Sequence, residues 1–471
     1  MSLFYLKGLD NVTQECKDIL LNPEVDNLPN WFDGKILRIG PAKFNIGNQK
    51  LNHWFDGLAM VYKFEKIGND IVFSNSFLKS PQYRANLKNK ILFDEFATLS
   101  PKNKLQKILT SIKRILKISK ERPSCNVNFM KAGKNLLAIT EVTNTIKLEN
   151  DGISTSGEYS FNDDIKGQIT CAHPQYDPDT KEQFNFAVSI GKDFEYSVFR
   201  MKNEEEKRNI ICKFKSKDFF YSHSLFLTKN YIILYAGPLR AKATSFLTKT
   251  FNESLYYKKD ARCEFIFIDR SSGDISKIDS ERMLFLHSVN AYEKDGFVNL
   301  DIVAYLDELN PYDNLYLDKI KTGSFMMRTE LRRYEIDILN KNSGYKILSK
   351  QNLEFPRINP GFLTKEYRYV YAAMQNQETS EEFFNGLVKL DLNNDQEDIL
   401  LLDEGEYISE PIFIKKPKAI DEDDGVIFIN VLDAKKDLSY ISILNAKDLT
   451  LLYKAYLPIK IPFSLHGIYL K

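Results

Sequence analysis

The feature that most constrains this chain is a long succession of short runs suited to β-strands. From about residue 30 onward, runs rich in Val, Ile, Tyr and Phe are separated by turns of Gly, Asn, Asp and Pro. No linker or change of composition divides the 471 residues. The pattern predicts one all-β domain over residues 1–471, and a β-propeller arranges so many strands without long exposed sheet edges.

The composition argues against several classes of protein. A net charge of +1 is unlike that of a nucleic-acid-binding protein, which usually has a strongly basic surface. The apolar fraction of 43% is ample for a large core, and the aromatic fraction of 13% suits strands and apolar pockets. No Gly-rich loop of the kind that cradles a phosphate is seen, so we expect no organic cofactor.

The cysteines and the N-terminal segment bear on the cellular compartment. The five cysteines lie far apart and form no CxxC pair, which fits neither a disulfide framework nor a zinc site. The N-terminal segment lacks the apolar run of a signal peptide, and no stretch approaches the length of a transmembrane helix. We therefore expect a cytoplasmic protein without a transmembrane segment.

Residues 101–122 are the exception to the strand pattern. Lys and Arg residues are frequent there, and five apolar residues recur at helical spacing: Leu105, Ile108, Leu109, Ile112 and Leu116. A basic amphipathic helix of this kind is typical of an element that docks on a membrane surface. A solvated helix that packs its apolar stripe on the propeller fits the same pattern, so both interpretations stay open.

Histidine is rare in this chain, and four of its five histidines lie in strand-like or apolar surroundings. They are His173, His223, His287 and His466, at intervals of 50, 64 and 179 residues. These intervals exclude a local metal motif such as HExxH, but a propeller can bring distant strands to one axis. An isolated histidine of this kind is usually a core residue. Four together indicate a metal site, because imidazole binds iron, zinc and copper.

Motifs along nearly the whole chain resemble the carotenoid cleavage oxygenase family, which includes carotene oxygenases, retinoid isomerases and stilbene-cleaving enzymes. Beside the four histidine segments, they are GKILRIGPAKF (34–44), HWFDGLAMVYKF (53–64), SEPIFIKKPKAIDEDDGVIFINVL (409–432) and SLHGIY (464–469). The segments look most like animal-type carotene oxygenases and their microbial relatives. One departure is Ile39, where the family usually has Asn, in a stretch that we expect to form a packing turn.

The resemblance implies a seven-bladed β-propeller, with loops and short helices over an Fe(II) ion on its axis. The iron ligands would be His173, His223, His287 and His466. The segment that ends the chain would then be a strand of the closing blade, held at the axis by a metal bond. His53 matches no ligand, and we expect it at the surface or in a loop.

The resemblance also implies carboxylates that hold three of these histidines. The pairs would be Glu141 with His223, Glu354 with His287 and Glu410 with His466, leaving His173 without a carboxylate. Each glutamate taken alone would more often lie on a solvated face. Thr140 would lie near the open iron position, where stilbene-cleaving relatives carry a lysine.

The reaction that the resemblance implies is oxidative cleavage of a conjugated C=C bond in a carotenoid or apocarotenoid. Fe(II) can activate O2, whereas zinc is redox-inert, and both oxygen atoms would end in two carbonyl products. A carotenoid has no charge to grip, so its selection implies a tunnel lined by aromatic side chains. Five aromatic residues near the motifs suit a tunnel or the core: Phe55, Tyr62, Phe285, Tyr292 and Phe463.

Because carotenoids partition into bilayers, we expect peripheral association with a membrane surface. Two other functions stay open. One is an oxygenase of another apolar alkene, or a retinoid isomerase, on the same iron site. The other is a propeller that binds a metal or a partner without catalysis.

Overall fold

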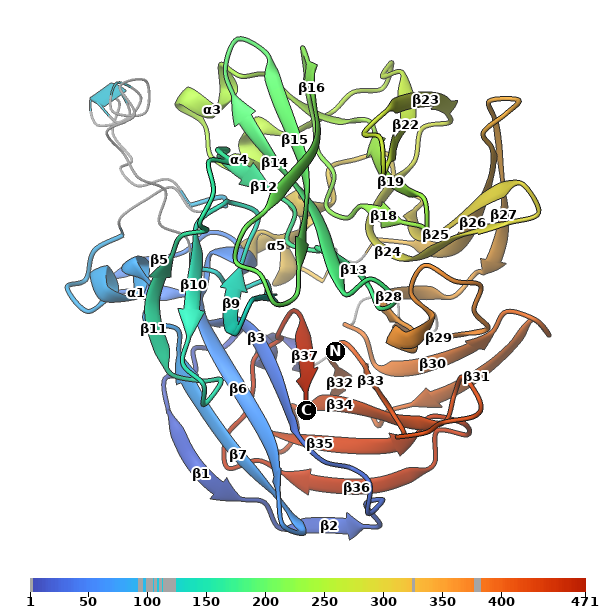
Figure 1. Ribbon diagram of the computed structural model, residues 1–471. Helices are drawn as coiled ribbons and strands as arrows, with labels where there is room; N and C mark the ends of the chain where they lie inside the picture. Colours follow the sequence, from blue (N-terminus) through green and yellow to red (C-terminus); the bar gives the residue numbers. More distant parts are fainter. Residues whose placement is uncertain are drawn as a thin grey trace.

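The computed structural model describes residues 3–91, 96–98, 105, 108–109, 112, 124–323, 327–376 and 383–471. These residues form an all-β fold, as the strand pattern predicts. Within them, seven sheets have four strands or more. Figure 1 shows these large sheets following one another in chain order around the middle of the molecule.

The first four large sheets are antiparallel. The first, in the order β1-β7-β6-β3-β37, holds β1 (Cys16–Leu20), β3 (Lys35–Lys43), β6 (Leu58–Ile67), β7 (Asp70–Phe77) and β37 (Gly467–Leu470). The second holds β8 (Asn128–Ala132), β9 (Asn135–Ile139), β10 (Thr145–Leu148) and β11 (Thr155–Tyr159). The third holds β12 (Ile169–Thr170), β13 (Gln175–Asp177), β14 (Glu182–Ile190), β15 (Phe194–Lys202) and β16 (Asn209–Ser216). The fourth holds β18 (Phe226–Leu227), β19 (Tyr231–Ala236), β22 (Cys263–Asp269) and β23 (Ile275–Ser280).

The remaining sheets continue in the same manner. The fifth holds β24 (Leu284–Lys294), β25 (Phe297–Tyr305), β26 (Thr329–Asp337) and β27 (Asn342–Ser349). The sixth holds β28 (Asn352–Arg357), β29 (Tyr369–Gln375), β30 (Gly386–Asp391) and β31 (Gln396–Leu401). The seventh holds β2 (Pro23–Asp26), β32 (Glu406–Ile408), β33 (Ile412–Lys415), β34 (Gly425–Asp433), β35 (Leu438–Asn445) and β36 (Leu451–Tyr456). Two small sheets comprise β17 (Phe219–Phe220), β20 (Leu239–Ala241) and β21 (Tyr256–Tyr257), and β4 (Asn45–Ile46) with β5 (Gln49–Lys50).

The helices that the structure describes are all short. They are η1 (Phe4–Leu9), η2 (Trp54–Asp56), α1 (Pro81–Asn86), α3 (Ser245–Thr248), α4 (Phe251–Ser254), η3 (Pro311–Leu315), α5 (Leu317–Ile320) and η4 (Pro360–Phe362). Among the residues described, none of them has the length and apolar character needed to cross a membrane. The predicted helix over residues 101–122 lies mostly outside the described residues. Four of its apolar side chains are described, in helical conformation and each at least 44% exposed: Leu105, Ile108, Leu109 and Ile112.

Burial along the strands follows their apolar content. The middle strands β25 and β34 are buried along nearly their whole length, and both are rich in Val and Ile. The outer strand β31 reads QEDILL and is almost entirely exposed. Apolar side chains are therefore removed from water where neighbouring sheets pack together. Each buried Val, Leu or Ile there stabilises the folded state by about 1.5–3 kcal/mol.

Seven apolar clusters fill the spaces between neighbouring sheets. Each successive pair from the first sheet to the seventh shares one cluster, and a further cluster joins the seventh sheet to the first. In that last cluster the ring centroids of Phe64, in β6, and Phe428, in β34, lie 5.1 Å apart. The core is thus divided among the contacts between sheets instead of gathered in one centre.

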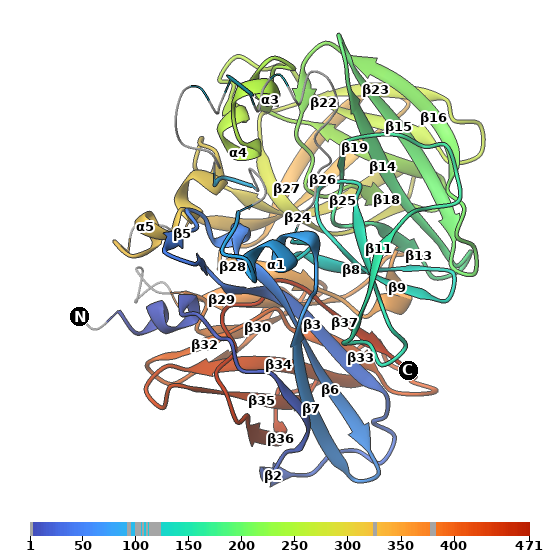
Figure 2. The same cartoon turned by 90° about the vertical axis from the view of Figure 1, so that its left-hand side faces the viewer.

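The C-terminal strand joins the first sheet, and an N-terminal strand joins the seventh. The C-terminal β37 pairs with β3 of the first sheet, and the N-terminal β2 pairs with β36 of the seventh. Figure 2 places the two termini on opposite sides of the molecule. Because β37 pairs with β3, a distant part of the chain, the residue directly before it, His466, is held in place.

One expectation about this region is wrong. Ile39 lies in the middle of β3 and is fully buried, so RIGP forms part of a strand instead of a packing turn. Its main chain accepts a hydrogen bond from the Leu465 N–H (2.9 Å) and donates one to the His466 carbonyl (3.0 Å). The strand begins at Lys35 and continues through Gly40 and Pro41 to Lys43.

Candidate metal centre

Each of the seven large sheets carries, in or close to one of its strands, one residue that the sequence analysis assigns to a metal site. The first sheet has His466 directly before β37, and the second has Glu141 just after β9. The third has His173 between β12 and β13, and the fourth has His223 just before β18. The fifth, sixth and seventh have His287 in β24, Glu354 in β28 and Glu410 between β32 and β33.

Several of these strands are irregular where the functional side chain lies. The register of β24 with β25 shifts around His287, and that of β28 with β29 shifts after Glu354. Phe355, within this second irregularity, has φ of 55°, which is rare for a bulky side chain. A bulge turns a side chain out of its normal alternation, so these shifts aim polar groups at the centre of the molecule.

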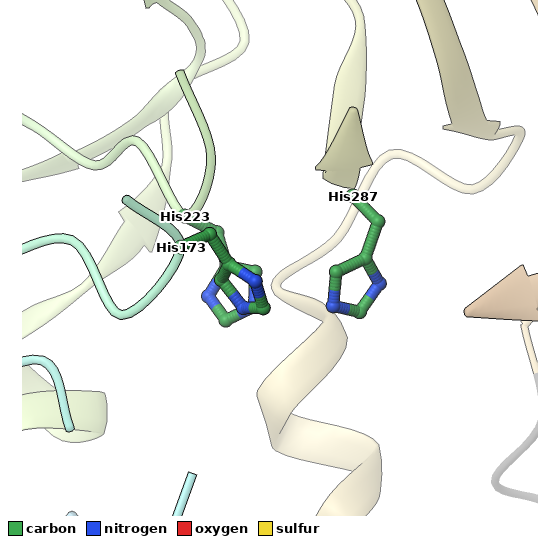
Figure 3. Close-up of side chains that lie close together, drawn as sticks. All are labelled: His173, His223 and His287. Carbon is green, nitrogen blue, oxygen red and sulfur yellow. The ribbon is translucent and has the colours of Figure 1, made fainter. Parts of the chain in front are cut away.

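The four predicted histidine ligands come together. Nε2 of His173 lies 2.9 Å from Nε2 of His223, and one ring nitrogen from each of His173, His223 and His287 lies within 4.8 Å of the others. Figure 3 shows the imidazoles of these three residues projecting into one space from separate segments. The ring centroid of His466 lies 4.5 Å from that of His173 and 5.1 Å from that of His287.

Three carboxylates bind the other ring nitrogen of three histidines. Nδ1 of His223 lies 2.6 Å from Glu141, Nδ1 of His287 lies 2.5 Å from Glu354, and Nδ1 of His466 lies 2.8 Å from Glu410. These are the pairs that the family resemblance implies, and among the described residues no carboxylate bonds the His173 ring. A carboxylate at Nδ1 keeps the proton on that nitrogen, so the lone pair of Nε2 is free for a metal.

Burial keeps the imidazoles of His173 and His466 neutral. Burial lowers the pKa of His466 to about 4, although Glu410 acts in the opposite direction. Burial, together with the neighbouring histidines, lowers the pKa of His173 well below its usual value. Burial raises the pKa of Glu354, but its hydrogen bonds with His287 and Tyr305 outweigh this and hold that pKa below the ordinary range. The pair of Glu410 and His466 is therefore a carboxylate bonded to a neutral ring, the form that a metal requires.

The histidine cluster fits a metal ion. Nε2 of His287 is buried, and among the described residues it has no hydrogen-bond partner. Two nitrogens at right angles on one first-row metal, each about 2.1 Å from it, would lie about 3 Å apart. The separation of 2.9 Å between His173 and His223 agrees with that value. Four imidazoles are a donor set that suits iron, copper or zinc.

Three tyrosines that the sequence analysis did not identify complete the surroundings of the glutamates. The Tyr221 hydroxyl donates to Glu141, and it lies 2.5 Å from the Tyr312 hydroxyl. The Tyr305 hydroxyl donates to Glu354 at 2.7 Å. Tyr221 precedes His223 by two residues, a strand-like spacing that places both side chains on one face and that could have revealed it. Tyr312 comes from η3, and only the tertiary structure brings it to His223.

The RIGP motif, residues 38–41, holds the segment before His466. The fully buried guanidinium of Arg38 donates to the Glu410 carbonyl (2.7 Å), the Ser464 hydroxyl (3.1 Å) and the Leu465 carbonyl (3.3 Å). Gly40 passes so close that a Cβ there would lie 2.5 Å from the Ser464 Cα. The motif therefore presses the terminal segment against β3 and fixes the position from which His466 projects.

His53 lies in the loop between β5 and η2, so the expectation of a loop position is confirmed and that of a surface position is wrong. His53 is completely buried, caps η2 by accepting from the Phe55 N–H (3.1 Å), and bonds the Tyr312 carbonyl through Nε2 (2.9 Å). Burial lowers its pKa to about 3. The surface expectation rested on His53 matching no ligand motif, but the aromatic rings of Phe55, Phe96 and Tyr316 surround it in the fold.

The five aromatic residues near the motifs differ in their surroundings. Tyr62, Phe285 and Tyr292 are buried in clusters between sheets. Phe463 stacks on Phe383 with ring centroids 3.9 Å apart. Phe55 is half-buried, and its ring lies 5.8 Å from Tyr312, which in turn bonds His223.

Phe355, which the sequence analysis did not identify, is the described phenylalanine in direct ring contact with the cluster. Its centroid lies 5.4 Å from that of His287 and 5.5 Å from that of His466. Thr140 directly precedes Glu141 and is half-buried. The Phe355 ring thus lies beside the histidines, in keeping with an apolar substrate.

The comparisons with known proteins agree with this architecture. The chain is 27% identical to the mitochondrial carotenoid-cleaving dioxygenase of Macaca fascicularis, over 94% of this chain and 90% of the relative. It is 27% identical to the beta,beta-carotene 15,15'-dioxygenase of Gallus gallus, over 94% of both chains. The structure of cobalt-substituted Synechocystis apocarotenoid oxygenase matches with a TM-score of 0.89 and 23% identity, over 99% of this chain and 98% of the other.

The match to a protein family extends over almost the whole chain. Residues 9–471 match the family described as retinal pigment epithelial membrane protein. The matched range contains all four clustered histidines and the three glutamates that bond them. The chain therefore belongs to this family, which is the carotenoid cleavage oxygenase family that its motifs resemble.

Proposed function

We propose that this protein is an Fe(II)-dependent dioxygenase that cleaves a conjugated C=C bond of a carotenoid or apocarotenoid into two carbonyl products. The observation that carries the proposal is the cluster of four imidazoles, three of them bonded at Nδ1 by a buried glutamate. The names of the relatives, carotenoid-cleaving dioxygenase and beta,beta-carotene 15,15'-dioxygenase, support the reaction class.

The proposal includes the architecture. The seven large sheets would be the blades of one β-propeller over residues 1–471, with the metal on its axis. Support comes from the seven clusters that join each sheet to the next and the last to the first. The exchanged terminal strands β37 and β2 would close the ring.

In this proposal His173, His223, His287 and His466 hold the metal through Nε2. Fe(II) bound there would supply the activation of O2, which redox-inert zinc could not. Glu141, Glu354 and Glu410 hold the Nδ1 protons and thereby fix the tautomer and the direction of each ring. Thr140, next to Glu141, would leave room at the open metal position where a larger side chain would obstruct it.

The substrate class follows from the walls of the site. Aromatic rings lie beside the histidines, among them those of Phe355 and Tyr312. Such walls exclude water and bind a polyene by shape and dispersion, because a carotenoid offers no charge. A polyene aldehyde or alcohol would fit the same walls.

The test of this function is isotopic. Protein loaded with Fe(II) under argon is mixed with a panel of carotenes and apocarotenals and exposed to 18O2. The aldehydes are reduced at once, because their oxygen exchanges with water, and analysed by mass spectrometry. Two products that both carry 18O are expected, and a His287→Ala variant should give none. Label in one product only would contradict the proposal, and isomerisation of a retinoid without 18O would favour the alternative function.

We further propose that the protein works at a membrane surface in a reducing compartment. The side chains of Leu105, Ile108, Leu109 and Ile112 are exposed, and each of these residues is in helical conformation, which suits insertion among lipids. Eight Lys and Arg residues in 101–122 would add attraction to anionic lipid, about 1 kcal/mol for each residue near the surface. All five cysteines are free, in keeping with reducing conditions.

Liposome flotation tests the membrane proposal. Ile108→Glu/Ile112→Glu should lower binding to anionic vesicles, and binding of the wild type should fall as salt is raised. The matched control is Leu339→Glu/Ile420→Glu, which makes the same change at two apolar side chains that are at least 90% exposed in other parts of the chain. If the first variant floats like the wild type, these residues do not anchor the protein.

A further inference from the structure

Strand β28 carries a second charged side chain into the region of the histidine cluster. Glu354, in this strand, bonds His287, and three residues later the Arg357 guanidinium points at a different pair. Nε of Arg357 donates to Oε1 of Glu410 at 2.9 Å, and an NH2 group donates to the Gly467 carbonyl at 3.0 Å. Strand β28 thus supplies a glutamate that bonds His287 and an arginine that bonds Glu410, the partner of His466.

Arg357 supports His466 indirectly, through two groups that adjoin it. Oε1 of Glu410 accepts from Arg357 and also from Nδ1 of His466, at 2.8 Å. Oε2 of Glu410 accepts from the Gly467 N–H at 2.9 Å, and the carbonyl of this same glycine accepts from Arg357. The guanidinium therefore fixes two groups. One is the Glu410 carboxylate, which orients the His466 ring, and the other is the main chain directly after His466.

Glu410 differs in this respect from the other two glutamates. Glu141 and Glu354 share their carboxylates with the neutral hydroxyls of Tyr221 and Tyr305. Among the described residues, Glu410 is the one of the three that forms a salt bridge with an arginine. Burial raises the pKa of Glu410, but Arg357 and His466 outweigh burial and hold that pKa well below the usual range.

The chemistry of arginine suits this task. A guanidinium is planar and presents its N–H groups in a fixed fork, so it can hold a carboxylate and a carbonyl at the same time with little loss of freedom. A lysine would supply the charge without the fork. Since His466 lies directly before the last strand of the chain, its position depends on contacts of this kind with other sheets.

We propose that Arg357 is a positioning residue of the metal centre, whose fork locks the Glu410 carboxylate and the Gly467 carbonyl so that the His466 imidazole faces the other three. The inference rests on the proposed function, because it requires His466 to be a metal ligand. The side-chain hydrogen bonds described for Arg357 go to Glu410 and Gly467 and not to a histidine, so Arg357 acts through these groups and takes no part in bond making.

The test measures metal binding directly. Metal-free wild type, Arg357→Gln and Arg357→Lys are titrated with Co(II), and the visible absorption of the bound ion reports affinity and ligand geometry. The matched control is Arg368→Gln, which removes a similarly exposed arginine from its ion pair with Asp391 (2.6 Å), a pair remote in sequence from the ligands. His466→Ala serves as the reference for loss of the ligand.

Arg357→Gln should bind Co(II) about 10-fold more weakly, the lower end of the effect of losing an outer partner of a metal ligand, with shifted absorption bands. Arg357→Lys should give a smaller loss, and Arg368→Gln should bind like the wild type. Wild-type affinity and spectrum in Arg357→Gln, with only a lower melting temperature, would make the pair a structural ion pair and overturn the inference. If Arg357→Gln does not fold, wild-type affinity and spectrum in Arg357→Lys overturn it in the same way. If His466→Ala also binds Co(II) like the wild type, the proposed metal centre itself has failed.

Discussion

His53 offers a quantitative prediction, because it is a completely buried histidine outside the cluster. Its Nδ1 accepts from the Phe55 N–H and its Nε2 donates to the Tyr312 carbonyl, so the neutral ring is fully satisfied. A second proton would have to sit on Nδ1, facing another donor and surrounded by aromatic rings. This is the physical reason why burial lowers the pKa of His53 to about 3.

The sign and size of the pH effect follow from this pKa. In the unfolded chain a histidine titrates near 6.5. Between that pH and about 3, the unfolded chain holds a proton at His53 that the folded protein does not, so stability falls as the pH falls. The loss is about 1.4 kcal/mol for each pH unit, which gives about 2 kcal/mol between pH 7 and pH 5.

The perturbation is His53→Asn, which keeps an acceptor for the Phe55 N–H but has no titratable group. At pH 7 the variant should be less stable by about 1–3 kcal/mol, because the Tyr312 carbonyl loses its donor. Between pH 7 and pH 5, however, the variant should lose about 2 kcal/mol less stability than the wild type.

Urea unfolding of the two metal-free proteins at pH 7 and pH 5 provides the four free energies. The other four histidines are the same in both proteins, so their contributions cancel in the difference. Equal losses of stability in wild type and variant would refute the reasoning, since His53 would then bind a proton as readily in the folded protein as in the unfolded chain.

The remaining predictions concern the metal centre and its support. Glu141→Gln, Glu354→Gln and Glu410→Gln should each weaken Fe(II) binding by about 10–100-fold without unfolding the protein, because the amide keeps the size of the side chain but not its charge. Metal analysis after dialysis would measure this loss. His466→Ala should lose most of its iron and His53→Asn should keep it; the opposite result would contradict the ligand assignment. Gly40→Ala should cost about 1–3 kcal/mol of stability and lower iron content, because its Cβ would overlap the Ser464 main chain. Gly344→Ala, where a Cβ meets open space, should be neutral in both measurements.

Much of the candidate site could be predicted from the sequence because its chemistry is carried by rare residues in recognisable motifs. Four of only five histidines lie in apolar strand segments, and the glutamates lie beside family motifs. Their pairing was implied by the resemblance, and the hydrogen bonds of the structure have the same partners. Tyr305, Tyr312 and Arg357 could not be found in this way, because a single tyrosine or arginine among 25 tyrosines and many basic residues carries no local signal.

The sequence by itself determined the all-β class, because alternation of apolar residues and turn residues is a local property of the chain. It also determined which side chains are chemically suited to a metal. The tertiary structure decided where those side chains go. Whether His53 is exposed, whether RIGP is a turn or a strand, and how the terminal histidine is fixed depend on contacts such as those of Arg38 with the Glu410 and Leu465 carbonyls. These partners lie hundreds of residues apart, and burial and strand pairing across such distances are set by the packing of whole sheets, which no short stretch of sequence encodes.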